Sequence, residues 1–111
     1  MKQLILTICF SIILFGNPSE VQLQIAEKYN WIRQDIRVEI RNELTSTGKC
    51  KDAIGCTYWI DNKPTRIEIK SDTKYFERVL IHEVVHYIFD IKDEDIVWDI
   101  TTRIIRWVNK Y

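Results

Sequence analysis

The sequence has no excess of charge of either sign. Its 111 residues include 16 Lys and Arg and 16 Asp and Glu, so the formal net charge is +0. Proteins that bind nucleic acid neutralise phosphates with Lys and Arg, and they usually carry such residues in excess. This chain has no basic run and no acidic tail. The composition therefore argues against a nucleic-acid partner.

The sequence also lacks internal repeats, low-complexity segments and a long apolar run. A chain of 111 residues has room for one domain only. The apolar stretch from Leu4 to Gly16 is interrupted by Thr7 and Ser11. It is shorter than the roughly 20 residues that a transmembrane helix needs. We therefore expect one globular domain of ordinary composition.

The apolar N-terminal stretch follows a positive start, Met1-Lys2-Gln3. This order is typical of a secretory signal peptide. We predict that residues 1–16 are a signal peptide and that the mature domain, residues 17–111, is secreted or periplasmic. An uncleaved anchor, with membrane association through residues 4–16, is the first alternative, and a buried N-terminal helix or strand is the second. No Cys directly follows the stretch, which argues against a lipoprotein.

Two of the three cysteines lie beyond this leader, at Cys50 and Cys56. An even number of cysteines in an exported chain favours a disulfide, and these two could close a small loop. Two unrelated thiols are the alternative.

The periodicity of the apolar residues predicts an α+β domain. Helical spacing covers residues 18–33, and strict alternation indicates a strand at 36–41. Two short strands, 57–60 and 65–70, flank turn residues at 61–64 and predict a hairpin. Helical patterns return after a capping segment, Ser71-Asp72-Thr73, up to about residue 89, and again over 94–109. The expected architecture is a helix, a small three-stranded sheet, a central helix and a C-terminal helix.

The two last helices differ in their apolar surfaces. Apolar residues surround nearly the whole helix that ends near Phe89, which predicts a central, buried helix. The C-terminal helix has one apolar face, which we expect to point inward: Ile96, Val97, Ile100, Ile104, Trp107 and Val108.

The two histidines of the chain lie on the predicted central helix, in His82-Glu83-Val84-Val85-His86. A spacing of four places both imidazoles on the same side of a helix. Two imidazoles and a carboxylate are costly on such an apolar helix unless they are paired or bound to metal. Zinc binds imidazole nitrogens at about 2.0–2.1 Å, and two such ligands one helical turn apart can share one ion. Histidines satisfied by hydrogen bonds inside a structural helix are the alternative.

Glu83 has the position of a general base in this pattern. Zinc lowers the pKa of a bound water towards about 7, so a neighbouring carboxylate can activate that water at neutral pH. Glu83 would accept the proton and pass it to the leaving amine.

With Leu80 and Ile81 before it, and with Gly55-Cys56-Thr57 and the strand from Arg66 to Lys70 earlier in the chain, this segment resembles the zincin metallopeptidases. The similarity is to the very small HExxH proteins of bacteria and their phages, and it spans roughly residues 55–107. It implies a minimal zincin-like fold, a bound Zn²⁺ and hydrolysis of peptide or protein substrates by a zinc-activated water. In zincins a strand at the sheet edge binds extended peptide, and the resemblance gives this role to the strand from Arg66 to Lys70. An ordinary edge strand, with its Arg, Glu and Lys side chains in water, is the alternative.

The third zinc ligand cannot be a histidine, because the extended HExxHxxGxxH pattern has Phe89 and Lys92 at its last two fixed positions. The resemblance is therefore to the gluzincin branch, in which an acidic residue of the following helix completes the site. Glu94 is preferred because it lies at the edge of the apolar face of its helix. Asp95 is the alternative, because Asp99 follows it at the spacing with which gluzincins orient a zinc histidine.

The sequence thus predicts an exported zinc peptidase with His82, His86 and Glu94 as metal ligands and Glu83 as the catalytic base. The alternative is a catalytically inactive binding protein of the same fold, with or without a membrane anchor.

Overall fold

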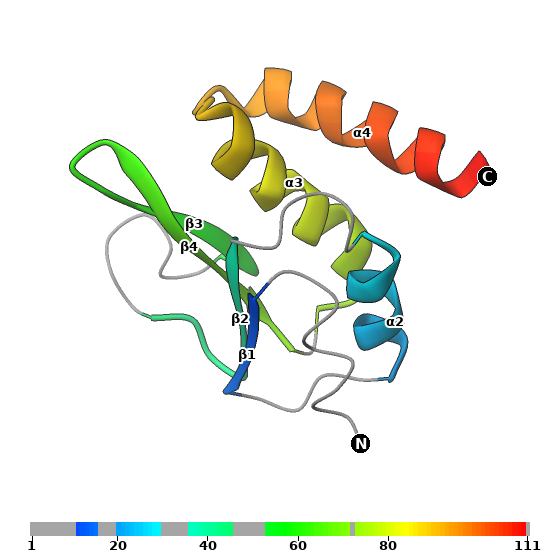
Figure 1. Ribbon diagram of the computed structural model, residues 1–111, viewed down its shortest axis with the longest axis horizontal. Coiled ribbons are helices and arrows are strands. Elements are labelled where there is room, and N and C mark those ends of the chain that lie inside the picture. Colours follow the sequence, from blue (N-terminus) through cyan, green and yellow to red (C-terminus); the bar gives the residue numbers. More distant parts are fainter. Residues whose placement is uncertain (1–10, 16–19, 30–35, 46–52, 72, 111) are drawn as a thin grey trace.

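The computed structural model describes residues 11–15, 20–29, 36–45, 53–71 and 73–110. They form an α+β domain, as predicted, in which helices and a mixed sheet pack together (Figure 1). In chain order the elements are β1 (Ser11–Phe15), α2 (Glu20–Lys28), β2 (Arg37–Arg41), β3 (Gly55–Ile60), β4 (Lys63–Lys70), α3 (Phe76–Phe89) and α4 (Glu94–Lys110). None of the described helices is both long enough and apolar enough to cross a membrane.

Among the described residues the sheet has four strands, in the order β1-β2-β4-β3, where the sequence predicts three. The additional strand, β1, pairs in parallel with β2 and lies inside the predicted leader, residues 1–16. A short apolar run suits a leader and a buried strand equally well, so its pattern does not separate them. The signal peptide stays a prediction, and its cleavage would leave β2 at that edge of the sheet.

The β3–β4 hairpin turns at Asp61 and Asn62, whose φ angles are 52° and 63°. Two successive residues with positive φ make the tight turn that matches the twist of a hairpin, and Asp and Asn tolerate this conformation. The turn is therefore shorter than predicted, since Lys63 and Pro64 already belong to β4. Central strand β4 then pairs in parallel with β2.

Helix α3 covers one face of the sheet, and α4 packs against α3 (Figure 1). Aliphatic side chains of β2 and β4 meet those of α3 in the core, which contains Val38, Ile40, Ile67, Ile69, Leu80, Ile81, Val84 and Val85. Helix α3 is thus the buried central helix that the sequence predicts. Its start differs, because Tyr75 occupies the N-cap and makes no side-chain capping bond. Of the predicted capping segment, Asp72 lies outside the described residues.

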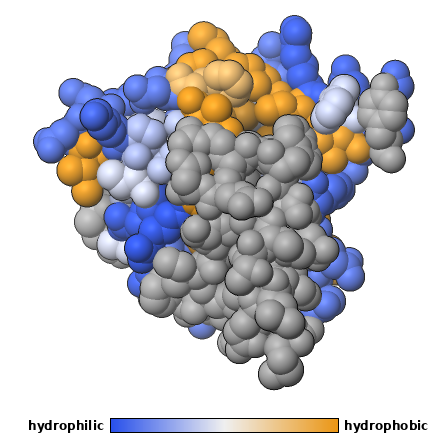
Figure 2. Space-filling model, viewed as in Figure 1, coloured by the Kyte–Doolittle hydropathy of each residue, from blue (hydrophilic) through white to orange (hydrophobic). Residues whose placement is uncertain are grey.

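The amphipathic face of α4 is only partly covered. Val97 and Thr101 are fully buried, whereas Ile96 and Trp107, both expected to point inward, are 49% and 57% exposed. Apolar side chains consequently gather on the surface over the α3–α4 pair, in the upper part of Figure 2. The apolar face of α4 is wider than the surface that α3 offers it.

Helix α2 is tied to α3 and α4 by polar side chains. The Tyr29 hydroxyl, just after α2, donates a hydrogen bond of 2.5 Å to Glu77, and Lys28 forms an ion pair of 3.1 Å with the same carboxylate. Lys28 also donates a hydrogen bond of 2.8 Å to Asn109 of α4. The predicted helix continues to residue 33, but residues 30–35 lie outside the described part, as does Cys50. The disulfide with Cys56 stays a prediction.

The sheet face opposite α3 carries buried carboxylates. Glu39 of β2 accepts hydrogen bonds from Arg37 and Arg41, at 2.7 and 2.8 Å. On the neighbouring strand, Glu68 is fully buried and accepts bonds from the Thr45 amide at 2.7 Å and from Arg66 at 2.9 Å. Alternation in β2 and β4 thus places apolar side chains towards α3 and ionic pairs on the other face.

Replacing Glu68 by Gln is expected to lower the free energy of unfolding by about 3 kcal/mol at pH 7, because it breaks a buried ion pair and leaves Arg66 with only the more distant Glu39 carboxylate, at 4.0 Å. Burial alone raises the pKa of Glu68, but hydrogen bonds from Thr45 and Arg66 outweigh it and hold this pKa below its usual range. The ionised carboxylate therefore stabilises the fold above the unfolded-state pKa of about 4.3, and this contribution is lost as the pH falls through the lower folded-state pKa.

Urea unfolding of both proteins at pH 7 and at steps below pH 4 measures this effect. The difference between wild type and variant should shrink in acid, while exposed Glu43→Gln serves as the control and should unfold like wild type. A difference that is absent at pH 7, or equal at every pH, would contradict the assignment.

Candidate metal centre

His82 and His86 face each other from successive turns of α3. Their Nε2 atoms lie 3.2 Å apart, and both residues are buried. Apolar neighbours fix the helix from both sides, because Ile81, Val84 and Val85 pack in the core. The two imidazoles lie on the edge of α3 that is not packed in the core.

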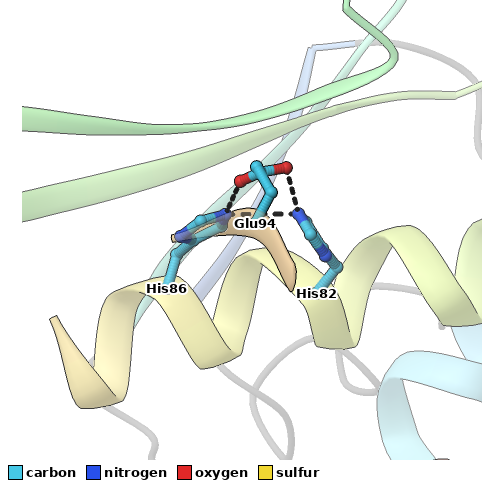
Figure 3. Close-up of side chains that lie close together, drawn as sticks. All are labelled: His82, His86 and Glu94. Carbon is cyan, nitrogen blue, oxygen red and sulfur yellow. Dashed lines mark hydrogen bonds and ion pairs between the residues drawn. The ribbon is translucent and has the colours of Figure 1, made fainter. Parts of the chain in front are cut away.

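Glu94 reaches this pair from the first residue of α4. One carboxylate oxygen, Oε1, lies 2.6 Å from Nε2 of His86, and the other, Oε2, lies 3.1 Å from Nε2 of His82 (Figure 3). The chain turns back at Asp90, which has a left-handed conformation with φ of 53° and ends α3. This short corner returns the start of α4 to the exposed edge of the imidazole pair, where the Glu94 side chain stays 62% exposed.

The hydrogen bond made by Nδ1 of His86 determines whether Nε2 of the same ring carries a proton or a lone pair. Nδ1 of His86 lies 2.5 Å from the carbonyl oxygen of Ile91, which can only accept, so Nδ1 must carry the proton. In the neutral ring Nε2 then holds a lone pair. That lone pair faces a carboxylate oxygen and a second imidazole nitrogen, so the arrangement needs a positive charge between the three groups.

A metal ion or a shared proton can supply this charge. Protonation of one ring would place an imidazolium in a buried position, and burial lowers the pKa of His82. Four ligands at zinc bond lengths stand about 3.3 Å apart in a tetrahedron. The separations of 3.2 and 3.1 Å between these donor atoms are close to this value, whereas the 2.6 Å between Nε2 of His86 and Oε1 of Glu94 is shorter. The donor atoms of His82, His86 and Glu94 all lie within 4.8 Å of one another, and two imidazoles with one carboxylate fit zinc.

The other acidic residues near the start of α4 do not join this cluster. Asp93 caps the helix, since its Oδ1 accepts a 3.1 Å bond from the amide of Ile96. Asp95 is exposed, and Asp99 lies 3.3 Å from Arg103 on the outer side of α4. Of the two candidates that the sequence offers, the structure brings Glu94 to the histidines and leaves Asp95 in solvent.

Glu83 lies beside the cluster and is held from the sheet. The Thr57 hydroxyl of β3 lies 2.8 Å from Oε1 of Glu83 and 3.1 Å from its backbone carbonyl. Gly55 allows this approach of β3 to α3, because a Cβ there would lie 2.4 Å from a methyl carbon of Val79. Burial raises the pKa of the Glu83 carboxyl, against the opposing effect of the Thr57 bond. The sequence alone does not predict this role of Thr57, although Gly55-Cys56-Thr57 belongs to the segment on which the resemblance rests.

A cleft of about 470 Å³ opens between β3 and the α3–α4 corner. Residues of β3 line one side, and Glu83, His86, Lys92 and Glu94 line the other. Among the described strands β3 is at the sheet edge, whereas β4 lies between β2 and β3. The expectation that the strand from Arg66 to Lys70 is the edge beside the site is therefore wrong. The alternation of residues within a segment predicts that it is a strand. The order of strands in a sheet depends on which strands pair, and this alternation does not indicate it.

Comparison of the chain with protein-family models, with curated proteins and with solved structures finds no match. The resemblance to the zincins therefore stays a prediction, as do the bound zinc and the peptidase activity. What the described residues provide is the cluster, its buried neighbour Glu83 and the cleft.

Trp98 occupies the position at which the gluzincin pattern has an orienting acid, four residues after Glu94. Its ring lies 4.0 Å from the ring of His82, centroid to centroid, at an angle of 36°. Among the described residues none forms a hydrogen bond with the buried Nδ1 of His82. His82 is thus oriented by packing against an indole, whereas His86 is oriented by the backbone carbonyl of Ile91.

Proposed function

We propose that this protein is a zinc-dependent peptidase. His82, His86 and Glu94 would hold the ion, which supplies a Lewis acid and lowers the pKa of a neighbouring water. The observation that carries the proposal is the gathering of His82, His86 and Glu94, whose possible ligand atoms all lie within 4.8 Å of one another.

The residues around the cluster support a catalytic metal site rather than a structural one. A structural zinc site is closed by four protein ligands, whereas three protein ligands leave one position open. Glu83 lines the same cleft as His86 and Glu94, and its raised pKa suits a group that takes up a proton and releases it again. We propose that Glu83 takes the proton of the attacking water and gives it to the leaving amine.

The cleft is open along an edge strand, which favours an extended peptide as substrate. An edge strand offers unpaired backbone groups that can bind a peptide by strand addition. The proposed location is outside the cytoplasm, secreted or periplasmic, and rests on the charged and apolar order of residues 1–16. Retention of that segment would instead anchor the enzyme to a membrane.

Cleavage of a broad peptide mixture by the purified domain tests this function. Wild type should cleave peptides, lose its activity on treatment with a metal chelator, and regain it when zinc is added. Mass spectrometry of the products before and after these steps gives the measurement. A domain that binds zinc and peptides yet cleaves none would instead be the inactive binding protein of this fold.

A further inference from the structure

Lys92 is the one cationic residue among the described residues that line the cleft. Two carboxylates line it too, Glu83 and Glu94, but each has a partner. Glu83 bonds with Thr57, and Glu94 lies against the two imidazoles. With a divalent ion held by the histidines, the cleft would carry a net positive charge.

The geometry of Lys92 places this cation at one end of the cleft. Lys92 belongs to the corner between α3 and α4, two residues before Glu94, and its Nζ lies 5.3 Å from the ring centroid of Trp59 on β3. The Trp59 ring in turn lies 6.4 Å from that of His86, edge to face. The Lys92 side chain therefore extends from the α3–α4 corner towards Trp59 on β3, and its ammonium group lies on the His86 side of the cluster.

An ammonium over an indole face is attracted to the ring and keeps part of its hydration. No carboxylate among the described residues forms an ion pair with Lys92 within the cleft. Its charge is thus available to a substrate group, while Trp59 limits the directions in which the long side chain can point.

We infer that Lys92 makes the cleft selective for peptides with an acidic side chain on one side of the scissile bond. This inference rests on the proposed peptidase function and names its substrate class. Lys92 acts as a specificity residue only, because among the described residues no hydrogen bond or ion pair joins it to the proposed metal ligands or to Glu83. A partly exposed ion pair is worth a modest free energy, so the preference should be about threefold to fivefold.

Peptide pairs that differ only by Glu or Gln, at each of three positions before and after the cleaved bond, test the inference. Each pair is measured in two ways on zinc-loaded protein: by kcat/KM with wild type, and by binding affinity with Glu83→Gln. Wild type should prefer Glu on one side of the bond only, and the preference should weaken as salt is added. Lys92→Arg should keep the preference, Lys92→Gln should remove it, and Lys92→Glu should reverse it.

Lys74→Glu is the matched control. Lys74 also lies over an aromatic ring, at 6.0 Å from that of Tyr75, but it precedes α3 and is away from the cleft. This variant changes the net charge equally and should keep the wild-type preference. Equal cleavage of Glu and Gln peptides by wild type, or an equal change in the control, would overturn the inference and leave the peptidase standing. A Lys92-dependent preference in binding without any cleavage would overturn the peptidase and support the selectivity.

Discussion

Replacement of Glu83 by Gln is expected to lower peptide hydrolysis by about 10²- to 10⁴-fold, the typical cost of losing a general base. Gln has nearly the same size and can still bond with the Thr57 hydroxyl, which lies 2.8 Å from Oε1 of Glu83. It cannot take a proton from water. The variant should therefore fold and keep its zinc, and the loss should appear in kcat.

Steady-state rates of both proteins on one cleaved peptide give this measurement, with zinc content and circular dichroism in parallel. These two controls separate loss of the base from loss of the metal or the fold, which is necessary because Glu83 is buried next to the core. Equal rates for wild type and variant would show that Glu83 is not the base.

Glu94→Ala is expected to weaken zinc binding by more than about 100-fold, since it removes one of three protein ligands and exceeds the 10- to 100-fold typical of a supporting residue. Asp95→Ala is the matched control, because it removes the neighbouring acid from the same helical turn and should leave the affinity unchanged. Asp99→Ala should also have little effect, since Asp99 pairs with Arg103 away from the histidines.

Competition with a chromophoric chelator measures the zinc affinities of the wild type and of the three variants. Glu94 is 62% exposed, so its removal should not disturb the core, and circular dichroism provides the check. If Asp95→Ala strips the metal and Glu94→Ala does not, the ligand set is wrong and the spacing of Asp95 and Asp99 is the better guide.

Much of the fold follows from local periodicity. Alternation in β2 and β4 and the apolar circumference of α3 predict their type and burial correctly, because side-chain period and burial are properties of the segment itself. Glu94 could be preferred over Asp95 for a similar reason, since it lies at the edge of the face that carries buried Val97 and Thr101.

Other features depend on contacts between distant segments. The order of the strands places β3 at the edge beside the cluster, and Gly55 and Thr57 acquire their roles only through that placement. The backbone carbonyl of Ile91 orients His86, and because every residue has a backbone carbonyl, the residue type does not predict this contact. Strand β1 falls within a run whose composition also predicts a signal peptide, so periodicity did not identify it.

Bound metal, measured on purified protein by elemental analysis, tests the central assignment most directly. Three protein ligands at an open site should hold about one zinc ion per chain. His86→Ala should lose that ion, because Nε2 of His86 contacts both His82 and Glu94. One zinc per chain in wild type and little in the variant is the expected result. Near-zero zinc in both proteins, after incubation with excess zinc and removal of the unbound ion, would contradict it.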